Sequence, residues 1–326
     1  MMKSSKKFIL SIIALFVLII LGGCGTTAAK KTTTYAPKEL TVQFVPSQNA
    51  TTIEAKAKPL EKLLEKELHI PVKVSVSTDY NTIVEAMGSK KVDVGFLPPD
   101  AYVLAHQHYQ SKVLLLAQRY DVTGADDHNS KKLVDFYRSQ ILVRKDSGIK
   151  KLADLKDKKI AVQDTTSTSG WIFPAVGMYK NGIDINKNNI TTAQIKGHDQ
   201  GVLSVYNKDT DAAFVWQGAR NLVKSDVPNI MNEVVPIYTS AKIPNDTITV
   251  RGDMNAKWQK RISQAFKKSH KLKKATRSLQ MSTVTKATLL LKTVILISCV
   301  NITKLSKNWT NKHKDGSYYN YLCCSH

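Results

Sequence analysis

A run of five hydroxyl side chains, Thr165–Ser169, stands where an apolar stretch gives way to a segment with helical spacing. The run lies within QDTTSTSGW (residues 163–171) and follows KKIAV (residues 158–162). So many hydroxyls at the change from strand to helix suit three kinds of chemistry. They form a solvated turn, they supply a nucleophile, or they donate hydrogen bonds to an anion.

The anion site follows from the backbone of a helix that begins at Trp171, with Ser169 or Gly170 at its N-cap. The first N–H groups of a helix lack partners within it, and the helix dipole adds partial positive charge, so no formal cation is needed. Ser167, Thr168 and Ser169 add hydroxyl donors, and Gly170 permits close approach to the backbone. The alternative is an ordinary helix cap, because Ser and Thr are common there.

The nucleophile would need a base, and His198 with an aspartate would complete a triad with Ser167 or Ser169. The nucleophile elbow G-x-S-x-G is missing, however, because Ser167 takes the place of the first glycine before Ser169. His198 also suits a role as a donor to an oxyanion. We therefore expect a binding protein rather than an enzyme, with a serine hydrolase as the weaker alternative.

The segments around the hydroxyl run alternate between strand and helix patterns. Residues 38–46 and 71–78 alternate as strands, and the intervening helix has four leucines on one face: Leu60, Leu63, Leu64 and Leu68. Pro59 leaves the start of that helix open, and Asp79 is placed to cap the next helix. This order predicts parallel βαβ units and an α/β fold.

We expect two α/β lobes joined by crossings near residues 138–142 and 238–248. One lobe comprises residues 38–139 and 242–266, and the other comprises residues 140–241. Ligands of open α/β sheets lie beyond the carboxyl ends of the strands, where the helices begin. Two such edges would face each other here.

Three segments resemble the phosphonate-, phosphite- and phosphate-binding proteins of ABC importers. They are STDYNTIVEAMGSKKVDVGFLPPDAYVLA, ILVRKDSGIKKLADLKDKKIAVQDTTSTSGWIFP and IPNDTITVR, within a resemblance from about Leu40 to about Phe266. The resemblance implies a two-lobed, hinged periplasmic-binding-protein fold of type II. It implies a phosphorus oxyanion as ligand, a permease and an ATPase as partners, and no cofactor. A sensory lipoprotein with the same fold is the alternative function.

The resemblance also carries over a set of ligand contacts from several loops: Tyr80, Tyr102, Ser167, Thr168, Ser169, His198 and Asp246. Taken alone, the two tyrosines favour lobe packing over ligand contact. Asp246 has three possible roles: it is an ordinary turn residue, it accepts a hydrogen bond from a protonated P–OH group, or it pairs with the amine of an aminoalkylphosphonate. The loop Pro98–Asp100 departs from the small-residue loop of the family, so Asp100 either narrows the choice of anion or caps the next helix.

The first residues have the pattern of an export signal, with Lys3, Lys6 and Lys7 before an apolar run. The run ends in Leu21–Cys24, which resembles a lipobox. We expect a signal peptide over residues 1–23, lipid on Cys24, and a flexible linker over residues 24–37. The protein would then be anchored at the extracytoplasmic face of the membrane; an uncleaved anchor helix is the alternative.

The net charge of +22 is uneven, because residues 267–326 hold twelve Lys and Arg residues against Asp315 alone. Nucleic acid is not expected as a partner, since the basic residues form no recognised binding motif. Apart from Cys24, the cysteines are Cys299, Cys323 and Cys324, which leaves no paired metal motif. The resemblance stops at the start of this tail. We interpret residues 267–326 as an out-of-frame segment, with a genuine accessory segment as the alternative.

Overall fold

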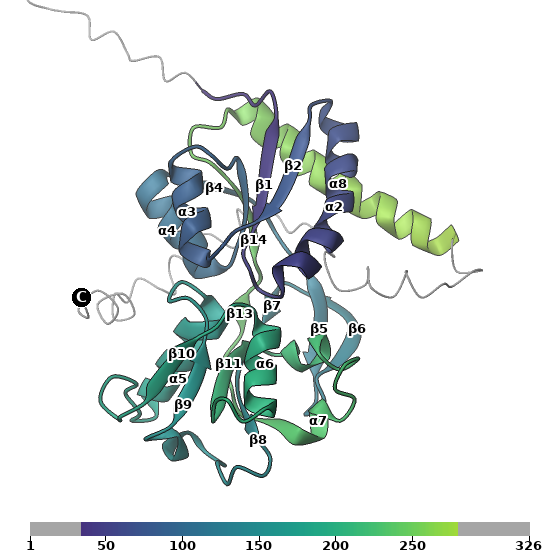
Figure 1. Cartoon of the computed structure of the whole chain (residues 1–326). Coiled ribbons are helices and arrows are strands. Elements are labelled where there is room, and N and C mark those ends of the chain that lie inside the picture. The colour runs from purple at the N-terminus through teal and green to yellow at the C-terminus, as the bar shows by residue number, and fades with distance from the viewer. Residues whose placement is uncertain (1–33, 280–326) are drawn as a thin grey trace, which may run out of the picture. The chain divides into compact units, whose positions relative to one another are not determined.

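Two five-stranded sheets organise the chain (Figure 1). The computed structural model describes residues 34–279, and side-chain environments over residues 34–268. The first sheet has the order β2-β1-β3-β14-β4, and the second sheet has the order β10-β9-β11-β8-β12. The strands of the first sheet are β1 (Leu40–Phe44), β2 (Val72–Val76), β3 (Val94–Leu97), β4 (Lys112–Leu116) and β14 (Thr247–Val250). Those of the second are β8 (Ser139–Arg144), β9 (Lys159–Val162), β10 (Thr191–Gln194), β11 (Ala212–Trp216) and β12 (Val234–Thr239).

Both sheets are mixed. In the first sheet β1 pairs in parallel with β2 and β3, whereas β14 runs antiparallel to β3 and β4. In the second sheet β9 is parallel to β10 and β11, whereas β8 is antiparallel to β11 and β12. The parallel units expected from the alternation are present, and the antiparallel strands, β14 and β8, are those by which the chain enters each sheet from the other.

Helices follow the parallel strands, as the sequence pattern predicts. The first sheet is accompanied by α2 (Ala50–Leu68), α3 (Tyr80–Gly88), α4 (Pro99–Tyr109) and α8 (Ala256–Leu279). The second is accompanied by η1 (Leu152–Leu155), η2 (Thr168–Ile172), α5 (Phe173–Lys180), α6 (His198–Tyr206), η3 (Ala219–Leu222) and α7 (Ile230–Glu233). Asp79 caps α3 by accepting the Thr82 N–H at 2.6 Å, as expected. Asn49 caps α2, and Pro59 lies inside that helix rather than at its start.

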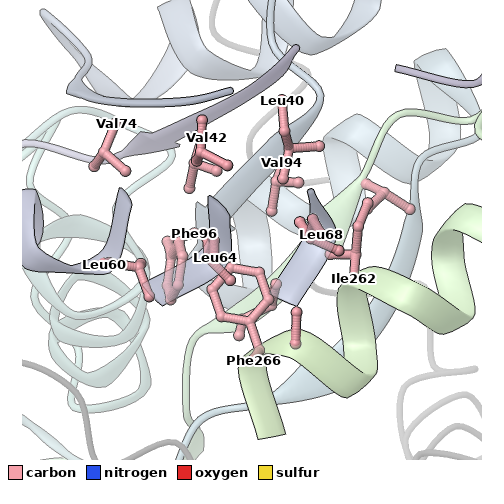
Figure 2. Packing of buried hydrophobic residues seen from close by; sticks show 14 of the residues in the cluster. Leu40, Val42, Leu60, Leu64, Leu68, Val74, Val94, Phe96, Ile262 and Phe266 are labelled. Atoms are coloured by element: carbon pink, nitrogen blue, oxygen red, sulfur yellow. The ribbon is translucent and has the colours of Figure 1, made fainter. Parts of the chain in front are cut away.

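The core of the first sheet is built by α2 and α8 packing against it and against each other (Figure 2). Leu60, Leu64 and Leu68 form the buried stripe of α2. From α8, the Phe266 ring meets the edge of Phe96 with centroids 5.7 Å apart. Burial of such aromatic and aliphatic side chains supplies most of the stability of a domain. The chain up to Phe266 is therefore integral to this core.

The chain passes between the two sheets by two segments that pair with each other. One contains β7 (Phe136–Tyr137) and the other β13 (Ile243–Pro244), which form a short antiparallel ladder. Before β7, a hairpin of β5 (Arg119–Thr123) and β6 (His128–Val134) makes a separate two-stranded sheet. Residues 112–137, for which the sequence pattern predicted no elements, hold β4 to β7.

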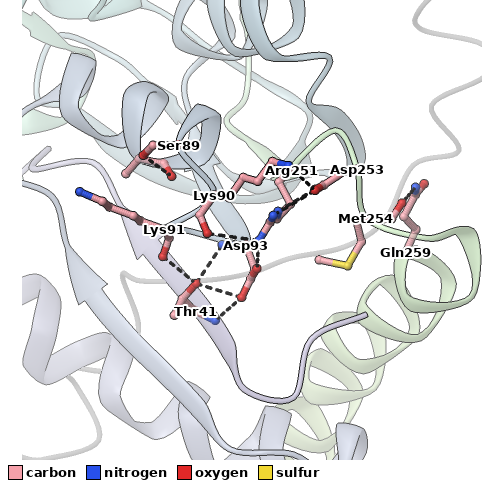
Figure 3. Close-up of polar contacts among 10 residues, drawn as sticks. Thr41, Ser89, Lys90, Lys91, Asp93, Arg251, Asp253, Met254 and Gln259 are labelled. Carbon is pink, nitrogen blue, oxygen red and sulfur yellow. Dashed lines mark hydrogen bonds and ion pairs between the residues drawn. The ribbon is translucent and has the colours of Figure 1, made fainter. Parts of the chain in front are cut away.

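A buried polar network joins the start of the folded chain to the segment after β14 (Figure 3). Asp93 accepts from the Thr41 N–H at 2.9 Å and pairs with Arg251 at 3.2 Å. Tyr35 lies under the Arg251 guanidinium, 3.8 Å from Cζ to ring centroid, and its N–H donates to the Asp253 carbonyl. Tyr35 was expected in the flexible linker, but these contacts place it in the folded unit.

The expected signal peptide and Cys24 lie outside the described residues. So does the predicted tail beyond Leu279, whereas residues 267–279 continue α8. Within residues 34–279, no helix is both long and apolar enough to cross a membrane.

Candidate functional site

The hydroxyl run leaves the carboxyl end of β9 and enters η2 as a turn of π-helix, not as the α-helix expected from the sequence. The Ser167 carbonyl accepts both the Trp171 N–H at 2.9 Å and the Ile172 N–H at 3.2 Å, which widens the turn. Ser167 is therefore the N-cap, and its Oγ accepts the Gly170 N–H at 3.2 Å. The expected caps, Ser169 and Gly170, lie inside the turn.

Two main-chain donors remain at the start of this turn. Among the described residues, the N–H groups of Thr168 and Ser169 have no hydrogen-bond acceptor. Gly170 does not provide room for a ligand, because a Cβ there would collide with the side chain of Gln163. Gln163 in turn bonds Gly197 in both directions, each at 3.1 Å, and so ties this loop to the start of α6.

Each hydroxyl of the triplet meets a residue from outside the second sheet. Ser167, Thr168 and Ser169 are buried, with exposed fractions of 1%, 0% and 4%. Ser167 interacts with the phenol of Tyr80 on α3, and Ser169 with the phenol of Tyr137 on β7. Thr168 accepts the Asp100 N–H, from the first turn of α4, at 3.2 Å. The hydroxyl run, which follows β9 of the second sheet, thus lies against α3, α4 and β7.

The two phenols are protonated donors. Burial raises the pKa of Tyr80, and the charge of Asp246 raises it further. Burial also raises the pKa of Tyr137 well above its ordinary value. Both hydroxyls therefore keep their protons at neutral pH and can donate to an oxyanion.

His198 is a neutral donor at the first position of α6. Its Nδ1 accepts the Trp216 N–H at 3.3 Å, so the ring proton sits on Nε2. Burial and the charge of Arg119 lower the pKa of His198 to about 3. With its proton on Nε2, the ring has no free lone pair there to activate Ser169, which argues against the hydrolase alternative.

The buried state of His198 predicts a dependence of stability on pH. Below its ordinary pKa of 6.5, the unfolded chain binds a proton here that the folded chain does not bind until the pH approaches 3. As far as His198 is concerned, the free energy of unfolding is therefore at its full value above pH 6.5 and decreases as the pH falls below it. Between pH 7 and pH 5 we expect the free energy of unfolding of the wild type to fall by about 2 kcal/mol more than that of His198→Gln.

Urea unfolding at the two pH values measures this difference. The exposed His108 supplies the control, because His108→Gln should retain the pH dependence of the wild type. Parallel losses in the wild type and His198→Gln would contradict the assigned neutral state.

Asp246 follows β13, and its main-chain carbonyl accepts the Ala117 N–H at 2.9 Å. Asp246 is half-buried, and its carboxylate lies deep enough for burial to raise its pKa. The charge of Arg119 opposes this rise, and Asp246 in turn raises the pKa of Tyr80 and Tyr137. Asp246 thus influences the pKa values of both phenols, and Arg119 influences those of Asp246 and His198, so these residues belong to one group.

Arg119 is the residue of this group that the sequence analysis did not find. Its guanidinium carbon lies 4.7 Å from the ring centroid of Tyr137 and 5.5 Å from that of Trp216. The expected anion site had no formal cation, so Arg119 changes the charge of the site. The available signal was its position, just beyond the carboxyl end of β4, where ligands of α/β sheets bind.

Tyr102 is not brought into this group. It packs half-buried beside the core around Tyr80, with its ring 5.8 Å from that of His106. Asp100, by contrast, lies against Thr168, and burial raises the pKa of its carboxyl group. In the described part of the chain no cluster of His, Cys, Asp or Glu has the makings of a metal site.

Main-chain N–H groups link the loops of the two sheets at four places. Tyr80 donates to the Asp164 carboxylate at 3.1 Å, and Asp100 donates to Thr168. Asn49 donates to Asp199 at 3.3 Å, and the His198 N–H donates to the Ser47 carbonyl at 3.0 Å. The hydroxyl run and His198 thus lie where the loops after the strands of both sheets meet.

A family model described as "ABC transporter, phosphonate, periplasmic substrate-binding protein" matches residues 42–289. The chain belongs to this family. Its members are substrate-binding proteins and not enzymes. The match extends beyond Phe266, where the sequence analysis placed the end of the resemblance.

Two curated relatives are similar to the chain in sequence. The "Phosphate-import protein PhnD" of Mycolicibacterium smegmatis is 30% identical over 209 residues, which cover 61% of this chain and 62% of the relative. The "Phosphonates-binding periplasmic protein" of Escherichia coli is 26% identical over 239 residues, covering 71% and 63%. The chain thus spans less than two thirds of the length of either relative.

A solved structure supports the fold. PhnD1 from Prochlorococcus marinus, in complex with methylphosphonate, matches with a TM-score of 0.65 at 17% identity. The match covers 87% of this chain and 99% of that one. The two-lobed, type II periplasmic-binding-protein fold expected from the sequence is therefore confirmed.

Proposed function

We propose that this protein is the solute-binding component of an ABC importer and that it captures a phosphonate, phosphite or phosphate. The observation that carries the proposal is the donor set around the hydroxyl triplet. The N–H groups of Thr168 and Ser169 are without acceptors among the described residues, and three hydroxyls adjoin them. A tetrahedral oxyanion needs several convergent donors of this kind.

The neutral His198 and the two phenols complete the set. His198 offers Nε2–H, while Tyr80 and Tyr137 offer O–H groups held protonated by burial. Charge-assisted hydrogen bonds of about 1.5–3 kcal/mol each, less the cost of ordering, suffice for micromolar or tighter binding. The anion would bind between the two lobes, in contact with donors from both.

The lobes would close on the ligand about the paired β7 and β13 segments. Such a short ladder lets two rigid lobes rotate while both connections stay in register. The closed form would then be presented to a transmembrane permease with its ATPase. Lipid on Cys24 would hold the protein at the extracytoplasmic face of the membrane, close to that permease.

The names of the relatives agree with this ligand class, since one imports phosphate, another binds phosphonates, and a third is complexed with methylphosphonate. The test is calorimetric titration of the purified protein with methylphosphonate, phosphite and phosphate, with acetate as a control. We expect saturable heat with at least one phosphorus anion and none with acetate. Folded protein that gives no heat with any of the three anions would overturn the proposal.

A further inference from the structure

The carboxylate of Asp246 stands apart from the other acids at the site. Asp164 accepts the Tyr80 N–H, and Asp100 is held against Thr168. Asp246 has neither a hydrogen bond nor an ion pair from its carboxylate to any described residue, although it is partly withdrawn from water. A carboxylate beside a bound anion repels it unless a positive charge stands nearby.

Arg119 supplies a positive charge in that position. The Asp246 carbonyl accepts the N–H of Ala117, two residues before Arg119, so the two segments lie together. The Arg119 guanidinium stacks on the rings of Tyr137 and Trp216. Tyr137 contacts Ser169, and the main-chain N–H of Trp216 donates to His198. Like Asp246, the guanidinium has no hydrogen-bonded or ionic partner among the described residues.

From this arrangement we infer that Arg119 determines which class of ligand binds. Its guanidinium provides the positive charge that the ammonium group of a ligand would otherwise bring to Asp246, so the site binds small phosphorus oxyanions that carry no cationic substituent. This inference rests on the proposed function and narrows it. With Arg119 present, the formal charges of Arg119 and Asp246 cancel. An ω-aminoalkylphosphonate would bring a second cation to a carboxylate that is already compensated, and Arg119 would repel it.

The geometry holds Arg119 in place. Its planar guanidinium lies against two aromatic rings, an arrangement that lysine does not reproduce. The hairpin that carries it is fixed by a fully buried ion pair between Asp127, between β5 and β6, and Arg220 of η3, 2.8 Å apart. Arg119 is therefore a fixed part of the site and not a mobile surface cation.

The test compares methylphosphonate with 2-aminoethylphosphonate by calorimetry in the wild type, Arg119→Gln and Arg119→Gln/Asp246→Asn. We expect the wild type to prefer methylphosphonate. Arg119→Gln should shift the ratio of the two dissociation constants toward the aminophosphonate by about 10- to 100-fold, the range for one charged hydrogen bond. Adding Asp246→Asn should abolish that shift, because the carboxylate that would bind the ammonium is gone.

Arg138→Gln is the matched control, since Arg138 stacks on Phe136 at 5.2 Å and carries the same charge close by. It should leave the ratio unchanged. An unaltered ratio in Arg119→Gln, or an equal shift in Arg138→Gln, would overturn the role of Arg119 while leaving the proposed function intact. Failure of every phosphorus anion, phosphite and phosphate included, to bind the folded wild type would instead remove the proposed function itself.

Discussion

Replacing Arg220 with methionine is expected to lower the free energy of unfolding by about 3–5 kcal/mol. Both Arg220 and Asp127 have side chains with 0% exposure. Arg220 Nε donates to Asp127 at 2.8 Å, and Nη1 donates to the Val234 carbonyl at 2.8 Å. Methionine fills a similar volume but leaves the Asp127 carboxylate buried without its cation. Such an uncompensated buried charge is the main reason why removing one partner of a buried pair is destabilising.

Urea unfolding of three variants separates the pair from the packing. Asp127→Asn removes the acid while retaining a residue that tolerates its left-handed backbone, φ +52°. The double variant Arg220→Met/Asp127→Asn should be more stable than Arg220→Met alone, because no uncompensated charge remains. If Arg220→Met cost less than about 1 kcal/mol, water or another group would have to solvate Asp127, contrary to the buried state described.

The elements that were predictable from sequence are those with strong local signals. The helix α3 has a capping aspartate at Asp79 and a buried stripe that includes Ile83 and Met87. The strand β11 is a continuous apolar run, and β9 is apolar after its first residue, Lys159. Local periodicity and capping chemistry suffice for such elements. The family resemblance of the segment around the hydroxyl run also placed this run correctly, after the carboxyl end of β9.

What escaped prediction depends on contacts between distant segments. The hairpin β5–β6 has mostly polar or half-exposed positions, and its burial pattern shows no clear alternation. It is fixed by Arg220, which lies 93 residues from Asp127 in the chain. The π-turn at Ser167 involves a nearer contact, the packing of Gln163 against Gly170, which capping and periodicity rules do not predict. The contacts of Arg119 with Tyr137 and Trp216 follow from that hairpin, and no local pattern predicts them.

The double substitution Ser167→Ala/Thr168→Ala is expected to weaken binding of the preferred phosphorus anion by about 3 kcal/mol or more, at least 100-fold in dissociation constant. Two hydroxyl donors disappear from a buried site where water cannot readily replace them. Losing Ser167 Oγ also leaves the Gly170 N–H without its cap, which costs about 1 kcal/mol of stability. Thermal unfolding of the ligand-free variant must therefore accompany the titration.

Thr165 offers a control within the same run, because it is exposed whereas Ser167 and Thr168 are buried. Thr165→Ala should bind like the wild type, since its hydroxyl already faces water. Unchanged affinity in the folded double variant would show that the two hydroxyls serve the turn alone, and that the N–H groups, His198 and the phenols bind the anion without them. A loss confined to the double variant would instead place the oxyanion at the opening of η2, where the donors of both lobes converge.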